Sequence, residues 1–109
     1  MALKSLTFTK GDKRILRIQV KENGTPKNIT GMTFKFGVKE NLADASYKIG
    51  PVTGVIDDVS QGHVSFTFNV GTNVFSGVYE VAMYDAAENR TTLTPAGGLS
   101  FRAMENIID

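Results

Sequence analysis

Alternation of apolar and polar residues with a period of two is the feature that most restricts how this chain can fold. The clearest example is residues 77–85, where Tyr79, Val81 and Met83 fall on one face of an extended backbone. Successive side chains of a β-strand point to opposite faces, so this period indicates a strand with one buried face. The other apolar runs are short and follow the same rule. The chain is therefore predicted to be one all-β domain organised around residues 77–85.

Seven further segments are predicted as strands, because turn-forming glycine, proline, asparagine and aspartate residues separate them. They span residues 5–9, 14–21, 32–39, 52–57, 63–70, 91–94 and 99–103. About seven to eight short strands in roughly 100 residues are typical of an immunoglobulin-like antiparallel β-sandwich. A closed barrel is the alternative architecture.

The inward positions of these strands are expected to form a dry layer between two sheets. Phe34, Phe66, Phe101 and Tyr79 are among them. Ile29 is expected to reach the same layer from a connection between strands. A fully buried large side chain contributes about 1.5–3 kcal/mol to folding. Phe34→Ala or Phe66→Ala should therefore cost about 3–5 kcal/mol each.

Two segments depart from this pattern. Residues 40–51 are expected to form a loop or an edge strand, since a helical turn at 42–45 would be too short to be stable alone. Residues 95–98 contain Pro95 and two glycines. They should break or bulge the strand that begins at Thr91, because proline removes a ladder donor and glycine permits a bend.

Length and composition limit the chain to a single domain. Its 109 residues can bury a core without staples, and the absence of cysteine removes disulfides and thiolate chemistry. The domain is expected to span residues 1–104, with 105–109 as a tail or the start of a linker. No apolar run is long enough for a signal peptide or a membrane span. Assembly in the cytoplasm, without membrane insertion, is the expectation.

The charge balance argues against nucleic acid as a partner. There are 12 basic and 11 acidic residues, and the formal net charge of +1 creates no large electrostatic field. Basic residues do gather between Lys10 and Lys21. On a strand they would form a solvated face, so no nucleic-acid site is predicted there.

No residue pattern points to catalysis, a cofactor or a metal ion. His63 is the only histidine in the chain. Ser60 with Asp57 or Asp58 lies on the same predicted turn, where these side chains cannot converge into a nucleophilic site. Acidic residues in this turn and at 85–89 lack the spacing of a calcium-binding loop. We therefore predict no catalytic, cofactor-binding or metal-binding residue.

The second face of residues 77–85 is apolar except for Glu80. A strand that is apolar on both faces is covered on both, so this face is a candidate contact with another subunit. The alternative is that a loop of the same chain, residues 40–51, covers it. The residues predicted to form a subunit interface are Ile15, Val78, Ala82, Tyr84, Ile107 and Ile108.

The order of short motifs along the chain supports a family resemblance. The motifs are FTKGD at 8–12, LRIQV at 16–20, ENGTP at 22–26, ITGMTF at 29–34, GHVSFTF at 62–68, GVYEV at 77–81 and GLSF at 98–101. Together they resemble the amino-terminal domain of tailed-phage baseplate upper proteins and related tail-fibre or tail-accessory proteins. The resemblance extends over nearly the whole chain.

This resemblance implies a non-enzymatic structural component of a bacteriophage or prophage tail or baseplate. Such a protein would assemble through contacts with other phage tail proteins, work as a homo-oligomer in the virion tail, and anchor or space host-recognition parts. The family offers no catalytic residue for this chain. The alternative function is a stand-alone immunoglobulin-like binding module of a bacterial surface or polysaccharide-active protein, which would recognise a glycan through loops 71–76 and 86–90.

Overall fold

A computed structural model describes residues 3–105 of the chain. These residues form eleven strands and no helix. Three of the strands have only two or three residues: β3 (Lys21–Glu22), β4 (Thr25–Pro26) and β10 (Arg90–Thr92). The other eight have four residues or more, and the short strands appear where turn segments pair locally. The prediction of an all-β chain is therefore confirmed.

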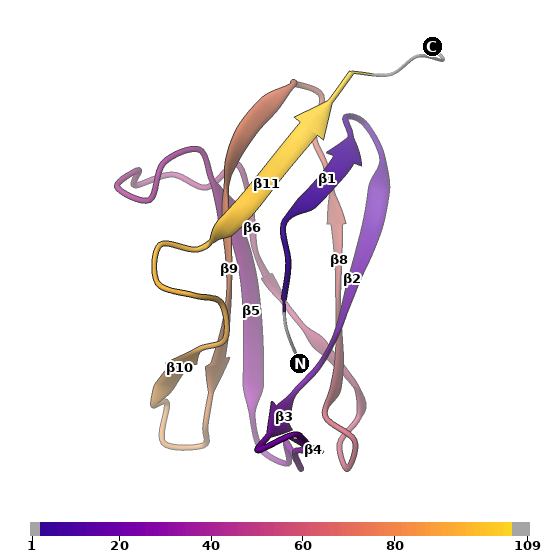
Figure 1. Cartoon of the computed structure of the whole chain (residues 1–109), viewed down its shortest axis with the longest axis vertical. Helices are drawn as coiled ribbons and strands as arrows, with labels where there is room; N and C mark the ends of the chain where they lie inside the picture. The colour runs from indigo at the N-terminus through magenta and orange to yellow at the C-terminus, as the bar shows by residue number, and fades with distance from the viewer. Residues whose placement is uncertain (1–2, 106–109) are drawn as a thin grey trace.

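Six strands form the larger sheet, which is mixed. Its order is β1 (Leu6–Thr9), β11 (Leu99–Met104), β9 (Phe75–Tyr84), β5 (Thr33–Lys39) and β6 (Ile49–Thr53), with β10 also paired to β9. The ten-residue β9 is its central strand, because β5 pairs along one edge while β11 and then β10 pair along the other. Figure 1 shows this sheet along the length of the molecule.

Three strands form the second sheet, in the order β2 (Lys13–Gln19), β8 (His63–Asn69) and β7 (Val55–Asp58). The chain passes from the first sheet to the second between β6 and β7, at Gly54. A Cβ atom on Gly54 would lie 2.7 Å from a methyl group of Val64 and 2.8 Å from the Phe66 ring. The single strand predicted at 52–57 is thus divided between two sheets, and glycine allows the crossing to pass close to the core.

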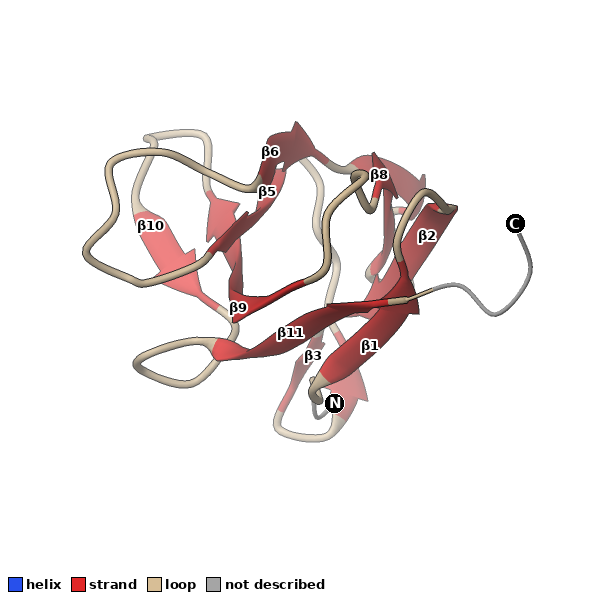
Figure 2. Cartoon of the chain, turned by 90° about the horizontal axis from the view of Figure 1, so that it is seen from above, coloured by secondary structure: helices blue, strands red, loops and turns tan. Residues whose placement is uncertain are grey.

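The prediction of a wholly antiparallel arrangement was wrong for one pair of strands. β1 and β11 are parallel, with Leu6 opposite Phe101 and Phe8 opposite Ala103. These strands come from the two ends of the described chain and lie side by side in Figures 1 and 2. A parallel pair needs a long connection, and here nearly the whole domain supplies it.

The inward faces of both sheets share one core. Phe34, Phe66, Phe101 and Tyr79 are each at most 1% exposed and belong to a single cluster of buried residues, as predicted. Phe36 links the two sheets, because its ring centroid lies 4.9 Å from that of Phe68 on β8. Ile29 enters the same cluster from a connection, and its burial is complete. The prediction that these residues are buried together in one core is therefore confirmed.

The edge beside β9 is interrupted where the sequence predicts a break. The chain leaves β9 after β10 and returns as β11, and the intervening segment turns through a hydrogen bond from the Gly98 N–H to the Pro95 carbonyl, 2.9 Å long. The outer faces of β5 and β9 lie between this interrupted edge and the loop of residues 40–48. The connection from β10 to β11 and the loop of residues 40–48 both lie on the left of Figure 1.

Candidate binding surface

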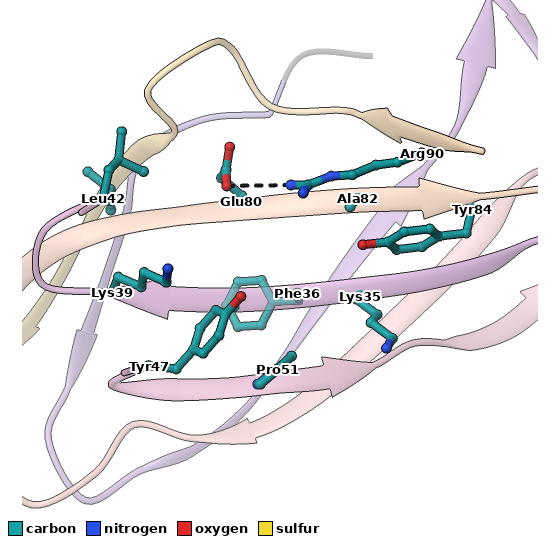
Figure 3. Close-up of a pocket in the computed structure, with 12 residues that line it drawn as sticks. Lys35, Phe36, Lys39, Leu42, Tyr47, Pro51, Glu80, Ala82, Tyr84 and Arg90 are labelled. Carbon is teal, nitrogen blue, oxygen red and sulfur yellow. Dashed lines mark ion pairs between the residues drawn. The ribbon is translucent and has the colours of Figure 1, made fainter. Parts of the chain in front are cut away.

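A groove of about 290 Å³ lies on the outer face of the six-stranded sheet. Its base is formed by outward-facing residues of β5 and β9. Leu42 and Tyr47 from the 40–48 loop lie at one end, and Arg90 of β10 lies beside β9 (Figure 3). Pro51 of β6 also lines it, so the groove is built by four strands and one loop.

Small side chains give the groove its depth. In the pairing of β5 with β9, Lys35 is opposite Ala82, Gly37 is opposite Glu80, and Lys39 is opposite Val78. The period of two places all six on the outer face of the sheet. The base of the groove therefore has a glycine and an alanine among long side chains, and the Tyr47 ring occupies the space over the glycine.

Gly37 is required for the position of Tyr47. A Cβ atom at residue 37 would lie 2.6 Å from Cε1 of Tyr47, which is closer than two such atoms can approach. The Tyr47 ring thus rests on the backbone of β5, while 46% of the residue stays exposed. The loop contributes an aromatic wall to the groove through this contact.

Three cations and one carboxylate line the groove and give it a formal charge of +2. Lys39 Nζ lies 4.9 Å from the ring centroid of Tyr47, and Lys35 Nζ lies 6.0 Å from that of Tyr84. Such contacts favour the ammonium group over the ring face. Within residues 3–105, neither lysine has a carboxylate within ion-pair distance, whereas Arg90 pairs with Glu80 at 3.7 Å (Figure 3).

The structure separates the predicted interface residues into two places. Val78, Ala82 and Tyr84 all line the groove, where Ala82 is buried and the other two are partly buried. Ile15 lies on β2 in the other sheet and is 46% exposed. Figures 1 and 2 both place β2 on the side of the molecule away from β10 and the 40–48 loop. The remaining two predicted residues, Ile107 and Ile108, lie outside the described part of the chain.

The loop before β6 covers only part of the outer face. No helical turn forms in it, and its bend is closed by hydrogen bonds between Asn41 and Asp44, in which the Asn41 N–H donates to the Asp44 carboxylate at 3.0 Å. Leu42 and Tyr47 reach over the end of the sheet but leave the groove open between them and Arg90.

Several groove residues were not identified from the sequence as parts of a site. The sequence does contain a signal for Lys35 and Lys39, because the alternation in residues 32–39 places both on the outward face, on either side of Gly37. The sequence contains no signal for Tyr47, because this residue lies in a segment without periodic alternation of apolar and polar residues. Its place in the groove depends on a contact between the loop and β5 that only the folded chain reveals.

The carboxylates of Asp57 and Asp58, near His63, accept hydrogen bonds within and beside the turn that joins β7 to β8. Asp58 accepts hydrogen bonds from the Ser60 hydroxyl (3.0 Å), the Ser60 N–H (3.1 Å) and the Gln61 N–H (3.2 Å). The bond from the Ser60 hydroxyl, followed by the bond from Gln61, lowers the pKa of Asp58 below its ordinary value. Asp57 accepts a bond from the Ser65 hydroxyl at 3.3 Å. His63 is exposed at the start of β8.

Asp85 has the same role in the turn after β9. Its carboxylate accepts hydrogen bonds from the N–H groups of Ala87 and Asn89, both 2.9 Å long. The bonds from Asn89 lower the pKa of Asp85. Residues 3–105 contain no group of three or more histidine, aspartate or glutamate side chains placed to hold a metal ion. The same part of the chain has no helix that could cross a membrane.

These features define an all-β domain whose distinctive surface is a basic, aromatic-lined groove on the outer face of a sheet. The chain matches the family model of the BppU N-terminal domain over residues 3–90, and it belongs to this family. The family is a domain of phage baseplate upper proteins, so the resemblance noted in the sequence is confirmed. Membership indicates a phage baseplate-associated structural protein, a component of the virion tail that interacts with other phage structural proteins.

Comparison with curated proteins gave no match. Among solved structures, the chain is similar to the ASH/PapD-like domain of human CEP192 (PapD-like domain 7), with 18% sequence identity over 94% of this chain and 82% of that chain. The TM-score is 0.33. At this score the likeness says nothing about what the chain binds.

Proposed function

We propose that the chain is a non-enzymatic structural component of a phage or prophage tail that assembles through protein contacts at the groove and anchors or spaces host-recognition parts. The match to the baseplate family over residues 3–90 carries this proposal. The groove supplies the contact surface, because aromatic and apolar side chains such as Tyr47, Tyr84 and Val78 meet there with open space above them. Aromatic residues are enriched at the cores of protein interfaces relative to the rest of the surface.

The proposed architecture is an immunoglobulin-like β-sandwich spanning residues 1–104, with 105–109 as a tail or the start of a linker. Two sheets whose inward faces share one core support this architecture. In this arrangement the outer faces of the sheets point away from each other. One contact cannot then bury both Ile15 and the groove residues of the same copy.

We assign the two faces to different contacts. The groove would meet another tail protein. The outer face of the three-stranded sheet would meet a second copy of this chain, because Ile15 is 46% and Val55 is 62% exposed there. Light scattering should show that Ile15→Glu shifts the chain toward the monomer. An unchanged mass over a range of concentrations would remove the homo-oligomer from the proposal.

The test of the proposed function is incorporation of the chain into purified tails, measured by mass spectrometry. The wild-type chain should be present, and Tyr84→Arg should be lost because it adds a fourth cation and removes an aromatic wall. Thr25→Arg adds the same side chain to an exposed position of β4, which belongs to neither of the two faces, and should be incorporated normally. Thermal unfolding would confirm that both variants fold. Absence of the wild-type chain from purified tails would overturn the proposal.

A glycan-binding module is not favoured by the loops predicted for it. Sugars stack on exposed aromatic rings, and Phe75 is the only aromatic residue in loops 71–76 and 86–90. Its ring is stacked on buried Phe101, with the centroids 5.8 Å apart. That loop ring already has a partner within the core.

A further inference from the structure

We propose that the groove binds an extended, acidic segment of another protein, with two carboxylates four positions apart. The inference rests on the proposed function, since it names the chemistry of the partner that the groove would meet. Three observations support it: the position of the unpaired lysines, the spacing between them, and the mixed character of the groove base.

The lysines are placed to receive negative charge. Lys35 and Lys39 have no carboxylate partner within residues 3–105, and each ammonium group lies over a tyrosine ring that borders the groove. An acidic side chain entering the groove would therefore find two cations already positioned, with no existing ion pair to break. Charge complementarity of this kind guides the choice of partner and its orientation.

The spacing of the lysines selects an extended ligand. Lys35 and Lys39 are four positions apart along β5, and a strand rises about 3.3 Å per residue, so their Cα atoms are roughly 13 Å apart. In an extended peptide that runs along the sheet, side chains at positions i and i+4 face the same way and have the same separation. A helix rises about 1.5 Å per residue, so it would need acidic residues about eight positions apart to span the same distance. Carboxylates four positions apart therefore match the two lysines only in an extended segment.

The base of the groove favours a peptide over a dense polyanion. Between the two lysines, Gly37 lies under the Tyr47 ring and opposite Glu80, while Ala82 and Val78 of β9 lie opposite the lysines themselves. The middle of the ligand should therefore be small or apolar, because it would meet the Tyr47 ring and these two apolar side chains. Glu80 also projects here and keeps its pairing with Arg90. A polymer with a negative charge on every repeat would meet the Glu80 carboxylate. A protein segment with spaced acidic residues would not.

The experiment is fluorescence anisotropy with the full chain and a labelled seven-residue peptide, blocked at both ends. The peptide has glutamate at its second and sixth positions, leucine at the fourth and serine elsewhere. It should bind in a salt-sensitive manner, since the contacts are exposed ion pairs. Replacing both glutamates with glutamine should weaken binding roughly tenfold.

Matched variants locate the binding. The double variant Lys35→Gln with Lys39→Gln should weaken peptide binding roughly tenfold. Lys13→Gln with Arg17→Gln removes the same charge from exposed positions of β2, on the other sheet, and should leave binding within about twofold. Equal binding of the glutamine peptide, or unchanged binding by the Lys35 and Lys39 variant, would overturn the inference.

Two further measurements test the other possible occupants of the groove, an anionic polysaccharide and a second copy of the chain. Heparin that displaces the peptide and binds more tightly than it would assign the groove to an anionic polysaccharide and contradict the inference. Peptide binding that appears only when self-association is abolished by dilution would assign the groove to a second copy and contradict it equally.

Incorporation into tails separates this inference from the proposed function. If the Lys35 and Lys39 variant enters purified tails as the wild type does, while Tyr84→Arg does not, the acidic segment is wrong and the structural role remains. If the wild-type chain is absent from tails, the proposed function fails whatever the peptide does.

Discussion

The outer faces of the two sheets obey the same alternation but differ in what they present. The outer face of β2, β7 and β8 carries Ile15 and Val55 among polar neighbours, and most of its residues are exposed. The outer face of β5 and β9 carries apolar residues, unpaired lysines and a loop that rises over it. A period of two identifies which side of a strand is buried. The outward side chains, together with any loop that packs over them, decide whether the outer side can bind a partner.

The shared core is the part on which both faces depend, so its disruption should have the largest effect. Phe66→Ala should lower the free energy of unfolding by about 3–5 kcal/mol, because Phe66 is fully buried between the sheets. Thr67→Ala, the next residue on the exposed side of β8, should change it by less than about 0.5 kcal/mol. Urea denaturation measures both, and equal losses would mean that the inner and outer faces of β8 were assigned incorrectly.

Two glycines on β5 and β9 provide a finer comparison. A Cβ atom at Gly77 would collide with the backbone carbonyl of Lys39, which cannot move without separating β5 from β9. Gly77→Ala should therefore cost about 1–3 kcal/mol. Gly37→Ala collides only with the half-exposed ring of Tyr47, which can swing outward, so its cost should be below about 1 kcal/mol.

The same two variants should separate stability from groove shape. Gly37→Ala should weaken the acidic peptide because the aromatic wall moves, although the chain remains folded. Chemical denaturation together with peptide anisotropy gives both quantities. A large loss of stability in Gly37→Ala would show that Tyr47 is part of the rigid fold rather than an adjustable wall.

The smallest expected effect concerns the two turns in which aspartate carboxylates accept several hydrogen bonds. Asp58 precedes β8 and Asp85 follows β9, and both have a pKa lowered from 3.8. The unfolded chain therefore takes up protons first as the pH falls, so the stabilisation is present above the unfolded pKa and is lost on passing below the folded one. Asp58→Asn and Asp85→Asn should each reduce the drop in melting temperature between neutral pH and about pH 3. Glu40→Gln is the control, because it removes the same charge from a residue outside these turns. If it reduced the drop in melting temperature by as much, the turn hydrogen bonds would not be the cause of the pH dependence.

Alternation was sufficient to predict the inner layer and the common face of Val78, Ala82 and Tyr84, because both follow from a local period. It could not predict which strands share a sheet. Ile15 was therefore grouped with residues that lie on the other side of the molecule. The parallel pairing of β1 with β11 was missed for the same reason, since it depends on where the two ends of the domain meet.

The most direct test of the groove as the contact surface is hydroxyl-radical footprinting of the chain, free and within purified tails. The account predicts that Leu42, Tyr47 and Tyr84 react in the free chain and lose most of that reactivity in the tail. Equal reactivity of these three side chains in both states would contradict it, because the groove would then be open to solvent in the assembled particle.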